Sequence, residues 1–151
     1  MAKDIYYSQG IYPLKNTAKY KGSMPLCYRS HPEFLLCRWL DLNPNIIEWG
    51  SESVVIPYLK PTDGRIHRYF IDFNCVLRTA TGALEKYIIE YKPSKKLKQP
   101  LPSKRKAPKT LMYEMEEFAI NSSKWDAARQ YATKHNMKFT IITEKELGIK
   151  A

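Results

Sequence analysis

Two segments rich in β-branched and aromatic residues constrain the fold of this chain more than any other feature. Residues 68–73 (Arg-Tyr-Phe-Ile-Asp-Phe) and 87–92 (Tyr-Ile-Ile-Glu-Tyr-Lys) both have the composition of strands. Between them, residues 79–82 (Thr-Ala-Thr-Gly) have the composition of a turn. The sequence therefore predicts an antiparallel hairpin with polar residues near its open end.

The register of this hairpin determines which polar side chains meet. If the turn is centred near Thr81, Asp72 lies directly opposite Glu90. Because residues i and i+2 of a strand share a face, Lys92 lies on the same face as Glu90. We therefore expect two carboxylates and one ammonium group to converge on one patch of the sheet.

This combination of side chains is typical of a metal-dependent phosphodiesterase. A divalent metal lowers the pKa of the attacking water and neutralises the charge that builds on the phosphate. Mg²⁺ prefers carboxylate oxygens as ligands. Asp72 and Glu90 thus fit metal ligands, and Lys92 fits a group that orients the water or stabilises the charged phosphorane.

An ordinary pair of opposite charges on a solvated sheet face is the alternative interpretation, and such pairs contribute little free energy. Against it, Phe70, Val76 and Ile88 are expected to flank the charges on the same face. Charges among apolar side chains need a functional or structural reason. We therefore favour the catalytic interpretation.

The positive charge of the chain is concentrated in one segment. Residues 92–109 contain eight Lys or Arg and no acid, which leaves +2 of the net +10 for the other 133 residues. Such a segment is typical of a loop that holds nucleic acid, although a solvated, flexible loop has the same composition. The residues expected to contact the DNA backbone are Lys95, Lys96, Lys98, Lys104, Arg105 and Lys106.

The order of predicted elements is that of an α/β protein. A helix is expected from Ser30, as its N-cap, to about residue 42. The later elements are strands at 54–58, 66–77 and 84–91, an extended Pro/Lys-rich loop at 93–109, helices at 111–120 and 123–135, and a buried strand at 139–143 that is parallel to a neighbour.

Residues 1–29 are expected to form an arm that packs on a single domain of residues 30–151. The arm is rich in Tyr and Lys, and packing on the body is a commoner role for such tyrosines than stacking on bases. The tyrosines concerned are Tyr6, Tyr7, Tyr12, Tyr20 and Tyr28.

The cysteines do not indicate a disulfide framework, because Cys27, Cys37 and Cys75 are odd in number and lack close pairs. A zinc site built from Cys27, His31 and Cys37 with either His67 or Cys75 is a minor alternative. The sequence has no run that is long and apolar enough to cross a bilayer and no signal-peptide core. We therefore expect a soluble, intracellular protein without membrane contact.

Glu33 has two possible roles that the local sequence leaves open. In Ser30-x-x-Glu33, its carboxylate can accept the Ser30 backbone N–H as part of a capping box. Glu33 also begins the apolar stripe of its helix, from which its carboxylate could reach a metal beside the sheet.

The pattern Asp72…Glu90-x-Lys92 resembles the PD-(D/E)xK nuclease superfamily, with Ile71 in place of the proline. A longer series of motifs resembles the head completion nuclease family of T-even-like tailed phages, which is itself similar to TnsA-type endonucleases. The motifs that carry this resemblance are Lys19-Tyr20-x-Gly22, Tyr28-Arg29-Ser30-x-x-Glu33, Trp39-Leu40-Asp41-x-Asn43-Pro44, Trp49-Gly50-Ser51-Glu52, Ile56-Pro57-Tyr58, Arg68-Tyr69-Phe70-x-Asp72, Glu90-x-Lys92-Pro93, Asn121-x-x-Lys124-Trp125-x-Ala127-Ala128 and Ile142-Thr143-Glu144.

The resemblance implies a restriction-endonuclease-like αβββαβ core, a mixed sheet flanked by helices. It makes Glu33, Asp72 and Glu90 the metal-binding carboxylates and Lys92 the catalytic lysine, with Mg²⁺ as cofactor and Mn²⁺ as a substitute. The matching pattern also contains Glu52, a further acidic position, and because residues 49–52 lead into the first strand, the alternative role for Glu52 is to hold the junction between helix and sheet.

It further implies hydrolysis of double-stranded DNA with low sequence specificity, late in phage head completion. The expected location is the bacterial host cytoplasm during assembly, or the virion head or neck, with portal, neck or other head completion proteins as partners. The alternative from another class is a structural head-closure protein that binds DNA ends and retains a nuclease fold without turnover.

Overall fold

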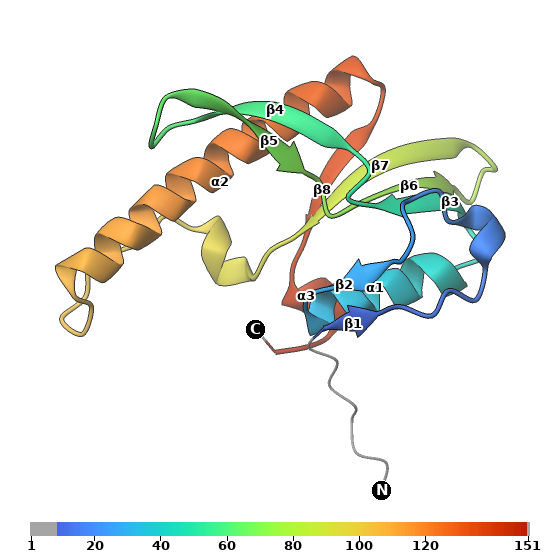
Figure 1. Cartoon of the computed structure of the whole chain (residues 1–151), viewed down its shortest axis with the longest axis horizontal. Coiled ribbons are helices and arrows are strands. Elements are labelled where there is room, and N and C mark those ends of the chain that lie inside the picture. The colour runs from blue at the N-terminus through green and yellow to red at the C-terminus, as the bar shows by residue number, and fades with distance from the viewer. Residues whose placement is uncertain (1–8, 151) are drawn as a thin grey trace, which may run out of the picture.

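The structure, a computed structural model, describes residues 9–150 (Figure 1). Its helices are α1 (His31–Leu42), α2 (Pro108–Lys134) and α3 (Glu144–Leu147), with 3₁₀ turns η1 (Thr17–Lys19) and η2 (Ser94–Leu97). Its strands are β1 (Gly10–Ile11), β2 (Cys27–Tyr28), β3 (Ile46–Ser51), β4 (Val55–Lys60), β5 (Arg65–Phe70), β6 (Phe73–Arg78), β7 (Leu84–Tyr91) and β8 (Lys138–Ile142).

A mixed four-stranded sheet with the order β3-β6-β7-β8 forms the centre of the molecule. The β6–β7 hairpin has the predicted register, because its pairs run from Arg78 opposite Leu84 to Phe73 opposite Ile89. β8 lies parallel to β7, as expected for a strand that follows a helical crossover. The α/β class with a mixed sheet flanked by helices is therefore confirmed.

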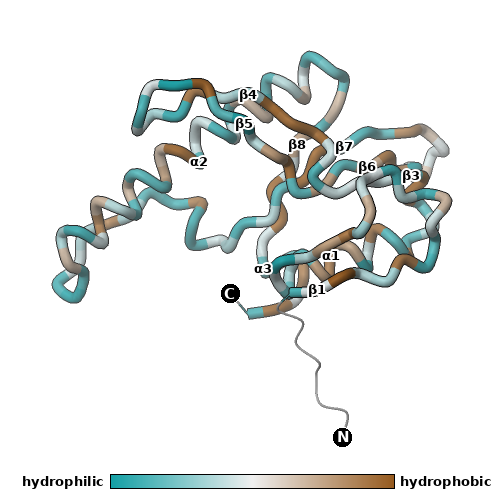
Figure 2. The backbone as a smooth tube through the Cα atoms, in the orientation of Figure 1, coloured by the Kyte–Doolittle hydropathy of each residue, from teal (hydrophilic) through white to brown (hydrophobic). Residues whose placement is uncertain are grey.

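The two faces of this sheet bury separate apolar cores. One core lies between the sheet, α1 and the described part of the N-terminal arm, and Trp49 and Leu40 are fully buried in it. The other core joins the sheet to α2 and to a two-stranded ribbon of β4 and β5, with Ile88 and Ala128 fully buried. Figure 2 shows hydrophobic residues along α1 and where the ribbon meets the sheet, and hydrophilic ones along the loop before α2.

The single long strand expected at residues 66–77 is wrong, because the chain changes sheets in the middle of it. Tyr69 and Ile71 pack in the core beside α2, whereas Phe73 packs in the core beside α1. Side chains two residues apart in an unbroken strand share a face, so the chain must break between Ile71 and Phe73. The break separates β5, which pairs only with β4, from β6, and it places Asp72 at the junction.

The expected first strand exists as β4, but it belongs to this ribbon and not to the central sheet. The edge of the central sheet is formed instead by β3, which pairs antiparallel with β6 and was not predicted. Its short segment Ile46–Ser51 contains a glycine and a charged residue, so its apolar pattern is weak.

The first helix and the packing of the arm agree with the sequence. The Glu33 backbone N–H donates to Ser30 Oγ at 3.3 Å, so Ser30 is the N-cap of α1. The arm tyrosines Tyr12, Tyr20 and Tyr28 are buried in the core beside α1. Tyr6 and Tyr7 lie outside the described residues, and the domain boundary at residue 29 stays a prediction.

The two helices expected at 111–120 and 123–135 are one continuous helix, α2. The segment Asn121-Ser122-Ser123 does not interrupt it, because Asn121 is buried and Ser123 Oγ donates to the Leu59 carbonyl at 2.6 Å.

The basic loop is also shorter and less extended than expected. It contains the turn η2, and Pro108 begins α2, where a proline is well tolerated. Among the described residues, no helix has the length and apolarity needed to cross a membrane.

Candidate active site

Asp72 lies where the ribbon passes into the central sheet, and backbone hydrogen bonds hold it there. The Glu52 N–H donates to the Asp72 carbonyl at 3.0 Å, and the Tyr91 N–H donates to Asp72 Oδ2 at 2.9 Å. Glu52 has a φ of +52°, which is rare for a residue other than glycine. Glu52 therefore contributes its backbone to the position of Asp72, while its side chain pairs with Arg29 at 3.3 Å.

Glu90 and Lys92 lie beside Asp72 at the end of β7. The Glu90 side chain is 8% exposed, and its Oε1 is 3.9 Å from Lys92 Nζ. Glu90 Oε2 is buried and has no hydrogen-bond partner within residues 9–150. The structure therefore brings Asp72, Glu90 and Lys92 together as predicted, with one carboxylate oxygen left for a ligand.

The two carboxyl groups make each other harder to ionise. Burial, and next the charge of Glu90, raise the pKa of Asp72 to about 8. Burial also raises the pKa of Glu90, although the positive charge of Lys92 opposes this shift. A bound cation would relieve both the burial cost and the repulsion, as expected for a pair of metal ligands.

Glu33 is close enough for its charge to raise the pKa of Asp72, but it does not join the other carboxylates directly. Its Oε2 accepts the Arg29 backbone N–H at 2.9 Å. The capping box is therefore only partly as expected, because Glu33 accepts from Arg29 and not from Ser30.

No group of three or more His, Cys, Asp or Glu in the described part of the chain is arranged to hold a metal ion. The minor zinc alternative is thus not supported for the cysteines and histidines considered. Two oxygen-donor carboxylates with an unpartnered Glu90 Oε2 nevertheless fit Mg²⁺, which keeps several waters and needs only one or two protein carboxylates.

Phe70 does not flank the charges as expected. The break at Ile71–Asp72 puts Phe70 on the outer face of the ribbon, where it is 45% exposed and lies 5.4 Å below the Arg68 guanidinium. Ile88 is fully buried and Val76 is partly buried, as the catalytic interpretation required.

The sequence missed two groups next to this site, Tyr69 and Lys124. Tyr69 is buried with its hydroxyl beside the Glu90 carboxylate, and burial followed by the charge of Glu90 raises its pKa. Lys124 Nζ lies 5.3 Å from the centre of the Tyr69 ring. Lys124 precedes the buried Ala128 by four residues, and this helical spacing could have placed it on the inward side of α2.

The end of β7 is also held from the β8 side. The Lys92 backbone N–H donates to the Ile142 carbonyl at 2.9 Å, and the Ser94 N–H donates to Glu144 Oε2 at 2.8 Å. The Ser94 hydroxyl donates to the other oxygen of Glu144. These contacts fix the backbone on both sides of Pro93. They therefore also fix the backbone position from which the Lys92 side chain extends.

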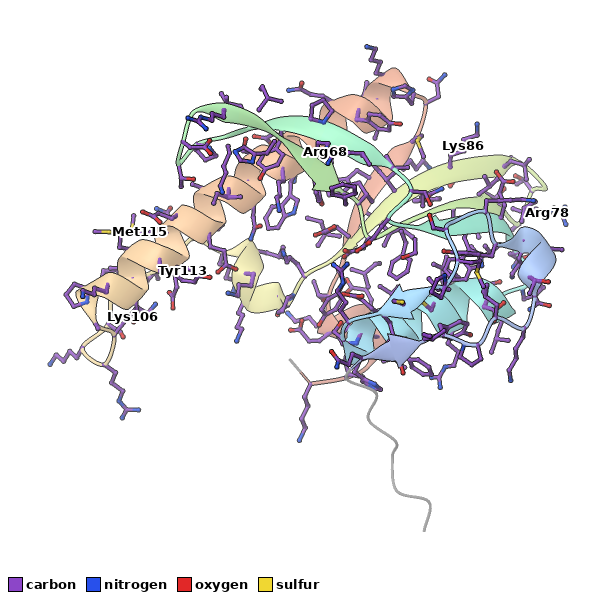
Figure 3. The ribbon with its side chains drawn as sticks, viewed as in Figure 1. Arg68, Arg78, Lys86, Lys106, Tyr113 and Met115 are labelled. Atoms are coloured by element: carbon purple, nitrogen blue, oxygen red, sulfur yellow. The ribbon has the colours of Figure 1, made fainter. Side chains whose placement is uncertain are left out.

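The basic loop is less uniform than its sequence suggests. Lys96 pairs with Glu117 at 2.9 Å and Lys106 pairs with Glu114 at 2.7 Å, so both lysines are tied to α2. Figure 3 labels Lys106 near the start of this helix. The other predicted DNA contacts are exposed, and no ion pair involves them in the part of the chain that is described; they are Lys95, Lys98, Lys104 and Arg105.

Comparison with known proteins gives two matches. A family model described as the N-terminal domain of TnsA-like endonucleases matches residues 43–144, which include Asp72, Glu90 and Lys92. The chain is 38% identical over 143 residues to the head completion nuclease of Enterobacteria phage T4, a match that covers 90% of this chain and 93% of that protein. No solved structure matches the chain.

Proposed function

Because the chain belongs to the family of TnsA-like endonucleases and of the phage T4 head completion nuclease, we propose that it is a metal-dependent DNA nuclease of phage head completion. The observation that carries this proposal is the group of Asp72, Glu90 and Lys92 at one end of the sheet. Glu90 is buried and Asp72 is partly buried, and the charge of Glu90 opposes ionisation of Asp72, which a bound cation would relieve.

Asp72 and Glu90 hold a divalent cation, with Mg²⁺ preferred and Mn²⁺ as substitute, and Glu33 adds negative charge nearby. The bound cation supplies Lewis acidity toward the phosphate and its attacking water. The ammonium group of Lys92, which lies beside Glu90, stabilises the charge that develops on the phosphate. The apolar surroundings strengthen these interactions, because they exclude part of the solvent.

The exposed cations of the basic loop bind the backbone of double-stranded DNA. Contacts to phosphate carry little information about sequence, so cleavage has low sequence specificity. Lys96 and Lys106 contribute less to this binding than the unpaired Lys95, Lys98, Lys104 and Arg105.

We place this activity late in head assembly, in the bacterial host cytoplasm or at the virion head or neck. This stage and location are supported by the similarity of the chain to the phage T4 protein that is named head completion nuclease. Its proposed partners are portal, neck or other head completion proteins.

The test is cleavage of supercoiled and linear duplex DNA with Mg²⁺ or Mn²⁺. Asp72→Asn and Lys92→Ala should each lower the rate by about a hundredfold or more, since each removes charge that acts on the transition state. Lys86→Ala is the matched control, because Lys86 is an exposed lysine further back on the same strand and same face.

Cleavage that survives in both site variants would place the activity elsewhere. A wild-type chain that binds DNA but cuts neither substrate would instead support the structural head-closure alternative.

A further inference from the structure

Lys124 is a half-buried lysine on α2 that faces the candidate active site. Its ammonium group lies over two tyrosine rings of the ribbon, 5.6 Å from the centre of Tyr58 and 5.3 Å from that of Tyr69. These two rings meet edge to face at 79°. The neighbouring Ser123 Oγ donates to the Leu59 carbonyl at 2.6 Å, which fastens α2 to the ribbon at this point. The position of Lys124 is thus fixed by both elements.

The surroundings of Lys124 leave its positive charge without a direct partner. Among residues 9–150, no carboxylate lies within ion-pair distance of Lys124. Burial, followed by the charge of Lys92, lowers the pKa of Lys124, and Lys60 acts in the same direction. Glu90 and Asp72 oppose this shift from a longer distance. Three lysines therefore share one region that has no acid close enough to pair with Lys124.

A structural role explains this arrangement poorly. Lys124 could serve as a distant counter-charge for Glu90, but Lys92 already occupies that place at 3.9 Å. The tyrosine faces attract a cation, yet they do not neutralise it. An anion that enters from solvent would satisfy Lys124 and reduce its repulsion from Lys92 and Lys60.

We propose that Lys124 binds a backbone phosphate of DNA next to the phosphate that is cut. This inference rests on the proposed function, because it takes Asp72, Glu90 and Lys92 as the site of cleavage. Lys92 lies against Glu90 and therefore acts at the cleaved phosphate, whereas Lys124 lies outside that contact and over the tyrosine rings. Lys124 is a substrate-binding residue that holds the strand in register with the carboxylates.

The test measures DNA binding without metal, so that it does not depend on cleavage. Binding of a labelled duplex is followed by fluorescence anisotropy with EDTA between about 50 and 200 mM salt. Lys124→Met keeps an unbranched, flexible side chain of similar size but removes its charge. The slope of log Kobs against log[salt] should become shallower by about 0.9, which corresponds to one lost phosphate contact.

Two further variants make the result specific. Lys134→Met removes the same charge from an exposed position on the same helix and should keep the wild-type slope. Lys124→Gln keeps a polar tip and should reproduce the slope of Lys124→Met, which covers the case in which the methionine variant folds poorly. Circular dichroism and a thermal melt verify the fold of each variant.

A wild-type slope in folded Lys124→Met and Lys124→Gln would overturn the proposal, and so would an equal loss in Lys134→Met. These outcomes are separate from a failure of the proposed function. A wild-type chain that never cuts DNA would refute the nuclease assignment, whereas the salt dependence tests the phosphate contact itself.

Discussion

The buried carboxyl of Asp72 makes the stability of the metal-free protein depend on pH in an unusual direction. Its pKa of about 8 in the folded state lies well above the ordinary value of about 4 in the unfolded chain. Folding therefore favours the protonated form. The stability that Asp72 contributes is fully present below pH 4 and is lost as the pH rises through about 8.

The size of this effect follows from proton linkage. One proton that is bound in the folded state but not in the unfolded state changes the free energy of unfolding by at most about 1.4 kcal/mol per pH unit. Between pH 5 and pH 7 the upper limit is thus a loss of about 2.8 kcal/mol. Because Asp72 retains some contact with solvent, we expect roughly half of this loss.

Urea denaturation in EDTA at several pH values between 5 and 8 measures this loss. Asp72→Asn should reduce it, because the amide does not ionise but can still accept the Tyr91 backbone N–H. Glu90, whose pKa is raised in the same direction, should leave a smaller pH dependence in that variant. Asp126→Asn changes an exposed carboxyl on α2 and is the control.

Parallel stability curves for wild type and Asp72→Asn across this range would refute the assignment of a raised pKa to Asp72. Addition of Mg²⁺ extends the test, since a cation that binds ionised carboxylates competes with protons. The stabilisation by Mg²⁺ should be larger at pH 8 than at pH 6 in wild type and smaller in Asp72→Asn.

Two further predictions concern the loop and the arm. Changing Lys95, Lys98 and Lys104 to Gln should make the salt slope of duplex binding shallower by about 2.7, for three lost contacts. Changing Lys96 and Lys106 to Gln should make the slope shallower by clearly less than the ~1.8 expected for two lost contacts, because both lysines already pair with glutamates; a change of about 1.8 would contradict this distinction. The buried Asp41 carboxylate accepts three hydrogen bonds from N–H or O–H groups of the arm, and an amide cannot accept all three. Asp41→Asn should therefore lower the free energy of unfolding, measured in urea, by about 1–3 kcal/mol. Stability equal to wild type would show that these hydrogen bonds do not secure the arm.

The sequence was sufficient to predict the central hairpin, because turn composition and strand composition agreed on one register. The position of Asp72 beside Glu90 and Lys92 followed from this register alone. The same reasoning did not predict the break between β5 and β6. Residues 66–77 are rich in β-branched and aromatic residues and contain no turn signal. Only the two cores on opposite faces of the sheet show that Tyr69 and Phe73 must point in opposite directions.

Two other differences arise from tertiary contacts. Asn121, Ser122 and Ser123 are weak helix formers, so the sequence suggested a break between two helices at this point. In the structure, burial of Asn121 and the hydrogen bond from Ser123 to Leu59 keep α2 continuous. The charge of the basic loop was correctly located. Its partial neutralisation by α2 was not predicted, because the acids concerned lie well outside the basic segment.

The continuity of α2 fixes the distance along the helix between the region of the candidate active site and the end of the basic loop. Lys124 lies beside the carboxylates, and Glu114, which anchors Lys106 of the loop, lies ten residues earlier on the same helix. At 1.5 Å per residue the two positions are about 15 Å apart, and a duplex that lies along α2 advances by about four base pairs over this length. If the chain cleaves DNA as proposed, this helix sets the distance between the cleaved phosphate and the backbone held by the loop. A single residue inserted into α2 would turn the loop by about 100° around the helix axis.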